Sequence, residues 1–143
     1  MAISLLILHF LAFSIGIGGG IANLVIGSKA AAADPVTKPV LGAASRAVGQ
    51  IASVGLLFLW ITGIAMVYTS WEGWASLPQL FWAKFAGVLV LTACSVLMNM
   101  HVIRAKRTGT PPPPATMRRL GIIGSGAAIL ALILAVQTFA PGT

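Results

Sequence analysis

The chain has 143 residues, of which 58 % are apolar and only 8 % are charged, and its mean hydropathy is +0.99. A water-soluble domain carries roughly 25 % charged residues, so this composition excludes a soluble globular protein and indicates one whose solvent is lipid. The net charge of +7 could suggest nucleic-acid binding. The basic residues, however, lie in the gaps between apolar runs, which is a signal of membrane topology, so we expect no nucleic-acid partner.

Four apolar runs are long enough to cross a membrane, at residues 3–27, 48–68, 80–103 and 120–139. Each one meets the roughly 20 residues that a helix needs to cross a hydrocarbon core of about 30 Å. A β-barrel would instead need alternating segments of about 10 residues. The sequence therefore predicts an all-α integral membrane protein, a single transmembrane domain over residues 1–143 that forms a four-helix up-and-down bundle. The first run has no basic residue before it, unlike a cleavable signal peptide, so we expect it to remain as a helix.

The first and third connections carry nearly all of the positive charge. Residues 28–47 are expected to form a loop because Pro35 and Pro39 interrupt a continuous helix, and residues 104–119 contain a stiff run of four prolines. All basic residues except Lys84 lie in these two connections or at their edges. The positive-inside rule then places both connections in the cytoplasm and both termini outside, in the periplasm of a bacterial inner (plasma) membrane. We expect the basic loops to meet anionic lipid headgroups or an acidic partner.

The second connection, residues 69–79, is short and rich in tryptophan. Trp71 and Trp74, with Trp82 just beyond, are expected to anchor the protein at the outer membrane interface, where amphipathic rings are enriched. The four spans leave no room for a second domain.

The first run contains the chain's most informative polar residue, His9, within the segment SLLILHFLAFSIGIGGG. An imidazole in so apolar a segment is costly unless it has a partner. Helical spacing places Gly16 and Gly20 on the same face as His9. Their spacing fits the pattern of small residues that lets a partner helix or a flat cofactor approach closely.

Depth in the membrane relates His9 to the third run. Counted from the outer ends of their runs, His9 lies about 9 Å and Lys84 about 6 Å inside the membrane, at 1.5 Å per residue. His101 lies about 25 Å beyond Lys84 along the helix axis. The two histidines therefore cannot hold one haem from both faces in a monomer, since each nitrogen would need to lie about 2 Å from the iron. His9 with Lys84, or His9 with an exogenous ligand, remains open.

Each of these residues also has a structural explanation. Lys84 could extend its ammonium group to the outer interface, and His9 could hydrogen-bond the backbone of a neighbouring helix. His101 precedes a basic run at the membrane edge, which is typical of an interfacial residue. Copper ligation by a thioether and imidazole set is the weakest hypothesis, because Met98, Met100 and His101 do not share one face. The single cysteine, Cys94, excludes an internal disulfide and a cysteine metal site, and we expect it to serve packing.

Three segments resemble a superfamily of small four-helix membrane proteins that includes the HemJ-type protoporphyrinogen oxidases and the copper-resistance-protein-D-like membrane domains. They are LLILHFLAFSIGIGGG, LLFLWITGIAMVY and LFWAKFAGVLVLT. In the HemJ-type proteins a first-helix histidine and a third-helix lysine are tied to haem b and to activity. The resemblance implies that His9 and Lys84 take these positions here. The chain departs from the pattern at its N-terminus, which lacks the lysine found near that histidine.

Two functions follow as hypotheses. The first is a haem-b membrane redox protein, in which His9 is a ligand to the haem iron, Lys84 is a second ligand or pairs with a propionate, and Gly16 and Gly20 line the porphyrin face. The second is a non-catalytic accessory subunit that packs against a larger membrane complex, or a homo-oligomer, through small-residue faces. No span contains a carboxylate, which argues against a proton pump or a cation channel. The sequence identifies no catalytic residue.

Overall fold

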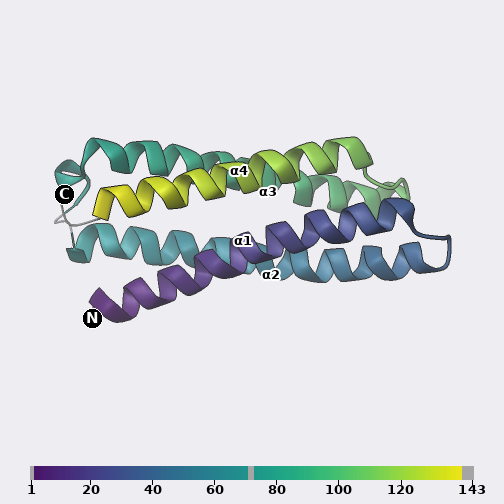
Figure 1. The fold of residues 1–143 in the computed structure, drawn as a ribbon, viewed down its shortest axis with the longest axis horizontal. Helices are drawn as coiled ribbons and strands as arrows, with labels where there is room; N and C mark the ends of the chain where they lie inside the picture. The colour runs from purple at the N-terminus through teal and green to yellow at the C-terminus, as the bar shows by residue number, and fades with distance from the viewer. Residues whose placement is uncertain (1, 71–72, 140–143) are drawn as a thin grey trace.

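A computed structural model describes residues 2–70 and 73–139, and these residues form four long helices. They are α1 (Ala2–Ala32), α2 (Thr37–Ser70), α3 (Gln79–Thr108) and α4 (Pro114–Phe139), with a short 3₁₀ turn, η1 (Trp74–Ser76), before α3. All four helices are long and apolar enough to cross a membrane. They run alternately up and down (Figure 1), so the predicted all-α, four-helix, multi-pass membrane fold is confirmed.

The helices extend well beyond the apolar runs, so the connections are shorter than we expected. The loop predicted at 28–47 is helical except for residues 33–36, and Pro39 lies in the first turn of α2, where a proline does not remove a helical hydrogen bond. Asp34 caps this helix, because its carboxylate accepts hydrogen bonds from the backbone N–H groups of Val36 and Thr37, each at 2.9 Å. Hydropathy detects the membrane span, whereas the helix itself continues into the polar region.

The predicted proline-rich connection is also shorter than 104–119. α3 continues to Thr108 and ends at Gly109, whose φ of 69° is left-handed and whose N–H bonds the carbonyl of Ala105 at 2.9 Å. This is a common way to end a helix, because glycine adopts that conformation at little cost. The last of the four prolines, Pro114, is the first residue of α4, a position that proline favours.

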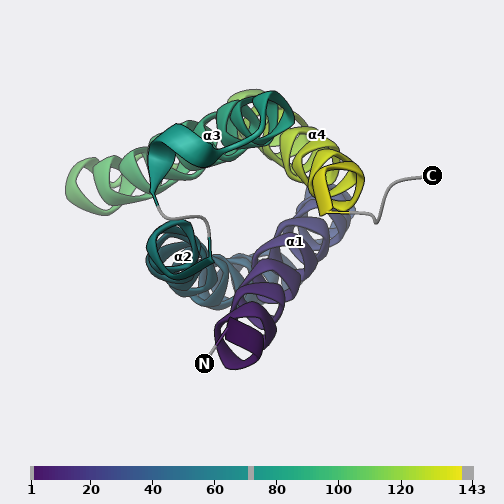
Figure 2. The same cartoon turned by 90° about the vertical axis from the view of Figure 1, so that its left-hand side faces the viewer.

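Two helical hairpins make up the bundle. α1 packs along α2, α3 packs along α4, and a shorter contact between α1 and α4 joins the two hairpins. Glycines permit these approaches: a Cβ on Gly19 would lie 2.7 Å from the Cβ of Ala52 in α2, and one on Gly87 would lie 3.2 Å from that of Ala131 in α4. The backbones of α2 and α3 do not pack in this extended way, as the end-on view in Figure 2 shows.

The buried residues are few, and many large apolar side chains face outward. Ala128 and Ala131 are almost fully buried in α4, whereas Ile3, Val25 and Ile133 are among many large apolar residues that are exposed. A soluble protein would bury such side chains. This inside-out distribution follows from a lipid surrounding, in which close packing of small residues rather than hydrophobic burial holds helices together.

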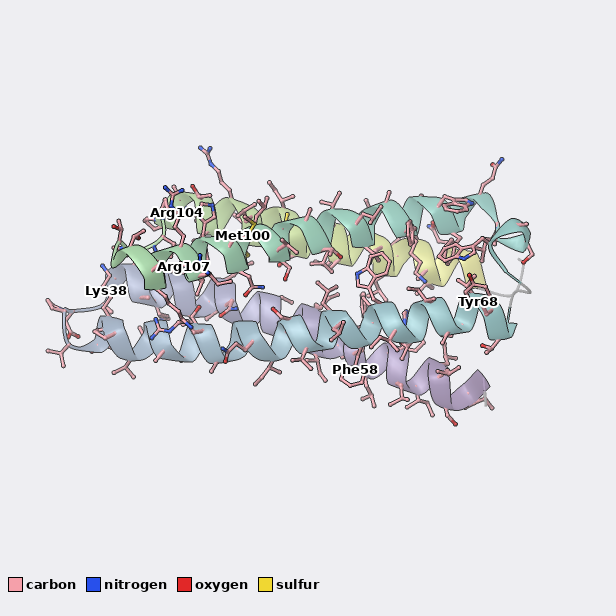
Figure 3. The ribbon with its side chains drawn as sticks, turned by 180° about the vertical axis from the view of Figure 1, so that it is seen from behind. Lys38, Phe58, Tyr68, Met100, Arg104 and Arg107 are labelled. Atoms are coloured by element: carbon pink, nitrogen blue, oxygen red, sulfur yellow. The ribbon has the colours of Figure 1, made fainter. Side chains whose placement is uncertain are left out.

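The basic residues gather at one end of the bundle. Lys38, Arg104 and Arg107 lie at the end where α1 turns into α2 and α3 turns into α4, and Tyr68 lies at the opposite end (Figure 3). The remaining cations, apart from Lys84, are placed by their helix positions at the same end as these three. The charge asymmetry expected from the sequence is therefore an asymmetry between the two ends of the folded bundle.

Candidate functional site

His9 has a side-chain partner on the neighbouring helix. Its Nδ1 lies 2.8 Å from the hydroxyl oxygen of Thr62 in α2, a residue that is only 4 % exposed. The Thr62 hydroxyl in turn donates its hydrogen to the backbone carbonyl of Phe58 at 2.7 Å. The sequence left open the alternative that His9 bonds the backbone of a neighbouring helix. His9 does contact a neighbouring helix, but through the side chain of Thr62 and not through a backbone group.

This relay favours one tautomer of the imidazole. A hydroxyl has one hydrogen, so both contacts of Thr62 are satisfied together when its hydroxyl donates to the Phe58 carbonyl and the Nδ1 of His9 donates to the Thr62 oxygen. In a neutral imidazole, Nε2 then carries no proton and has a lone pair to offer. A histidine whose Nδ1–H is held by a second group is the usual arrangement of a metal-ligating imidazole.

The surroundings of the ring leave Nε2 accessible. The ring lies against Gly63, where a Cβ would come 3.3 Å from Cε1 and 3.8 Å from Nδ1, while Nε2 lies farther away. Nε2 forms no hydrogen bond with the described residues, and no buried side-chain nitrogen or oxygen in them lacks a partner, so Nε2 is not sealed inside the protein. The lack of a side chain at Gly63 thus leaves room for the ring beside α2.

Lys84 lies in the same part of the bundle as His9. It is half-buried near the start of α3, with its Nζ 5.3 Å from the centre of the Phe81 ring. This is a cation–π distance. Both His9 and Lys84 lie toward the end of the bundle opposite the basic loops.

Aromatic side chains surround this region on α2 and α3. Trp60 packs edge-on against Phe85 with ring centres 5.5 Å apart, and its Nε1–H donates to the hydroxyl of Thr92 at 3.0 Å. Phe81 and Phe85 stack on each other with centres 6.2 Å apart. Large rings therefore bridge the two helices whose backbones stand apart, and they provide flat apolar walls beside Lys84.

Gly16 and Gly20, which were predicted to let a helix or a flat cofactor approach closely, have different surroundings. A Cβ on Gly20 would lie 3.4 Å from the hydroxyl oxygen of Ser125, so Gly20 serves the contact between α1 and α4. A Cβ on Gly16 would meet nothing within 4 Å, so its surface is open. The two glycines lie one turn apart on α1, but only Gly16 leaves open backbone.

The remaining sequence candidates lie elsewhere. Cys94 is buried, and a Cβ on Gly124 of α4 would come 3.3 Å from its Cβ, as expected for a packing residue. His101 lies toward the basic end of α3, far along the helix from Lys84. The described residues contain no cluster of three His, Cys, Asp or Glu side chains that could hold a metal ion. Trp74 and Trp82 pack on each other with ring centres 6.2 Å apart, whereas Trp71 lies outside the described residues.

Sequence reasoning missed Thr62, although it orients His9. The signal available was weak, since a threonine in an apolar run usually bonds its own helix, as Thr62 also does through Phe58. No protein-family model, curated protein or solved structure matches the chain. The site is therefore defined by its own chemistry: an oriented imidazole, a nearby lysine and aromatic walls.

Proposed function

We propose that the protein is a small membrane redox protein that binds haem b through His9. The observation that carries this proposal is the relay from His9 through Thr62 to the Phe58 carbonyl, which favours the tautomer with a lone pair on Nε2. The resemblance to the HemJ-type proteins supports the same residue.

The donor set fits this group. The imidazole Nε2 offers a ligand to the iron, and the aromatic rings of Trp60 and Phe85 offer flat apolar surfaces for a porphyrin. Lys84 supplies the remaining polar group, either as a second ligand in its neutral form or as a cation that pairs with a propionate. When bound, haem would supply one-electron chemistry, with a potential tuned by ligand identity and burial. The chain's own contribution is to orient the imidazole, to place a cation and to exclude water.

An absorption spectrum of the purified protein, expressed with an adequate haem supply, tests the proposal. The wild type should show a Soret band, His9→Ala should abolish it, and Lys84→Met should shift or weaken it. His101→Ala is the matched control, since the chain has two histidines, and it should leave the band intact. Loss of the band in His101→Ala with retention in His9→Ala would move the site to the basic end of the bundle.

A protein that shows no band even with haem supplied would favour the second function, an accessory subunit of a larger membrane complex or a homo-oligomer. The observation in its favour is the bare backbone on the outer surface. A Cβ on Gly18 or Gly126 would meet nothing within 4 Å, and both residues are exposed. Such positions allow a partner helix to approach closely.

We also propose that the basic end of the bundle faces the cytoplasm of a bacterial inner membrane, with both termini in the periplasm. The gathering of cations at one end supports this orientation under the positive-inside rule. Reporters inserted at Gly109 and fused after Thr143 test it. The first should report a cytoplasmic location and the second a periplasmic one, and a cytoplasmic signal at Thr143 would refute the orientation.

A further inference from the structure

At the basic end of the bundle, a pocket of about 590 Å³ opens between the two hairpins. All four helices contribute to its lining, together with the connection between α3 and α4. Its size lies in the range of about 300–1,000 Å³ that is usual for small-molecule sites. It lies toward the opposite end of the helices from Lys84, so it is separate from the candidate site described above.

Two cations stand among apolar walls in this pocket. Arg46 lines it from α2 and Lys106 lines it from α3, whereas most other lining residues are apolar, such as Ile26, Leu41 and Val102. A guanidinium nitrogen of Arg46 lies 3.6 Å from the position of a Cβ on Gly42, so this side chain lies along its own helix beside the pocket. A ligand for this lining must combine an anionic group with an apolar body.

The chain has far fewer acidic than basic residues. It has nine basic and two acidic residues. One of the two, Asp34, is engaged with the start of α2, where it bonds Val36 and Thr37. The other, Glu72, lies outside the described residues. Two carboxylates against nine cations mean that most of the counter-charge must come from outside the chain.

The depth of the pocket matches the membrane interface. α1 has 31 residues and is therefore about 46 Å long, compared with a hydrocarbon core of about 30 Å, so its ends reach the headgroup layer. The pocket residues Ile26, Gly27 and Ala30 lie in the last two turns of this helix. Basic pockets between transmembrane helices at this depth are suited to phospholipid headgroups.

We infer that this pocket binds one anionic phospholipid, with its phosphate between Arg46 and Lys106 and its apolar part against the pocket wall. Arginine and lysine both donate charge-assisted hydrogen bonds to phosphate oxygens. A site of this kind holds a defined lipid, in contrast to the diffuse attraction of a basic surface. The inference does not depend on haem binding, because it uses none of the same residues.

Native mass spectrometry of the full chain, reconstituted with equal amounts of phosphatidylglycerol and phosphatidylcholine of matched acyl chains, tests the inference. The wild type should retain one phosphatidylglycerol molecule in preference to phosphatidylcholine. Arg46→Gln and Lys106→Gln should each weaken retention about fivefold, since a basic group near the surface is worth about that factor in lipid attraction. Both side chains are exposed, so their replacement leaves the packing intact.

Arg118→Gln and Arg119→Gln are matched controls, because they remove the same charge at the same end but do not line the pocket. Equal loss of lipid in these controls would show diffuse attraction and overturn the inference. Displacement of the lipid by soluble glycerol 3-phosphate at the same concentration would also overturn it, since the site would then recognise phosphate without its acyl chains.

A second variant changes the space in the pocket without changing its charge. A Cβ on Gly27 would meet nothing within 4 Å, so Gly27→Phe can extend into the pocket without displacing backbone. It should abolish retention of phosphatidylglycerol, whereas Gly126→Phe, at an equally open position outside the pocket, should not. Full retention in a helical, folded Gly27→Phe protein would place the lipid elsewhere.

Discussion

Replacement of Gly19 by alanine offers a direct test of how the first hairpin is held together. A Cβ at this position would lie 2.7 Å from the Cβ of Ala52, whereas ordinary contact begins at 3.4 Å. The shortfall is 3.4 − 2.7, or 0.7 Å. The Cβ of Ala52 is fixed to its backbone and cannot turn aside, so α1 and α2 themselves must separate.

The expected cost follows from this overlap. Overpacking of a close contact costs typically 1–3 kcal/mol. Alanine also has a higher helix propensity than glycine, and this gain partly hides the cost. Gly18→Ala removes the ambiguity, because it is the same change at the adjacent position of the same helix, where a Cβ would meet nothing within 4 Å. Gly19→Ala should therefore be about 1–3 kcal/mol less stable than Gly18→Ala.

Unfolding in mixed micelles, followed by far-ultraviolet circular dichroism as the denaturing detergent is increased, measures this difference. A rescue variant sharpens it: the double replacement Gly19→Ala with Ala52→Gly removes the clashing Cβ from the other side and should restore most of the lost stability. Equal stability of the Gly18 and Gly19 variants, or failure of the rescue, would refute the close approach of α1 and α2 at this point.

Three further outcomes follow from single contacts. Thr62→Val should lower the free energy of unfolding by about 0.6–1.7 kcal/mol, the range for hydrogen bonds inside membranes, and a double-mutant cycle with His9→Leu should show that the two losses are not additive. Gly109→Ala should cost about 1–2 kcal/mol in the same unfolding assay, because its φ of 69° is left-handed. The hydroxyl of Thr37, with backbone N–H groups, lowers the pKa of Asp34 below its ordinary value. Its capping of α2 is therefore complete at neutral pH and is lost as the pH falls through that lowered pKa, which amide exchange in the first turn of α2 would detect.

Hydropathy was sufficient to predict the four spans and their alternation. A chain in lipid must satisfy its backbone hydrogen bonds within each segment, so long apolar runs have few structures open to them. The helix ends were not predictable in the same way. Residues 37–47 are too polar to be identified as part of a membrane span, and Pro39 suggested a break in the helix. In the structure α2 begins at Thr37, because Asp34 caps its first turn and a proline within that turn favours a helix.

The candidate site shows the limit of sequence spacing. Counting residues placed His9 and Lys84 at similar depth, because rise per residue is nearly constant along a helix. It could not select Thr62, since which residue of α2 meets His9 depends on the register and crossing of two helices. The same reason separates Gly16 from Gly20: helices that cross diverge within a turn, so one glycine contacts Ser125 and the other leaves open backbone.

The helices approach each other more closely within the hairpins than between α2 and α3. Within each hairpin, glycines allow a neighbouring helix to approach closely, as at Gly19 and Ala52. Between the hairpins, α2 and α3 stand farther apart, and the seam is crossed by longer side chains such as Trp60, which bonds Thr92, and Asn99, which bonds Ser53.

Polar groups are found both along this seam and within the first hairpin, where His9 bonds Thr62. His9 and Lys84 lie toward one end of the bundle, and the pocket with Arg46 and Lys106 lies toward the other. The hairpins approach each other closely through α1 and α4, where Gly20 meets Ser125. All four helices line the basic pocket, so a change in how the hairpins sit against each other must alter that pocket, whereas the bond between His9 and Thr62 lies within one hairpin and can survive it.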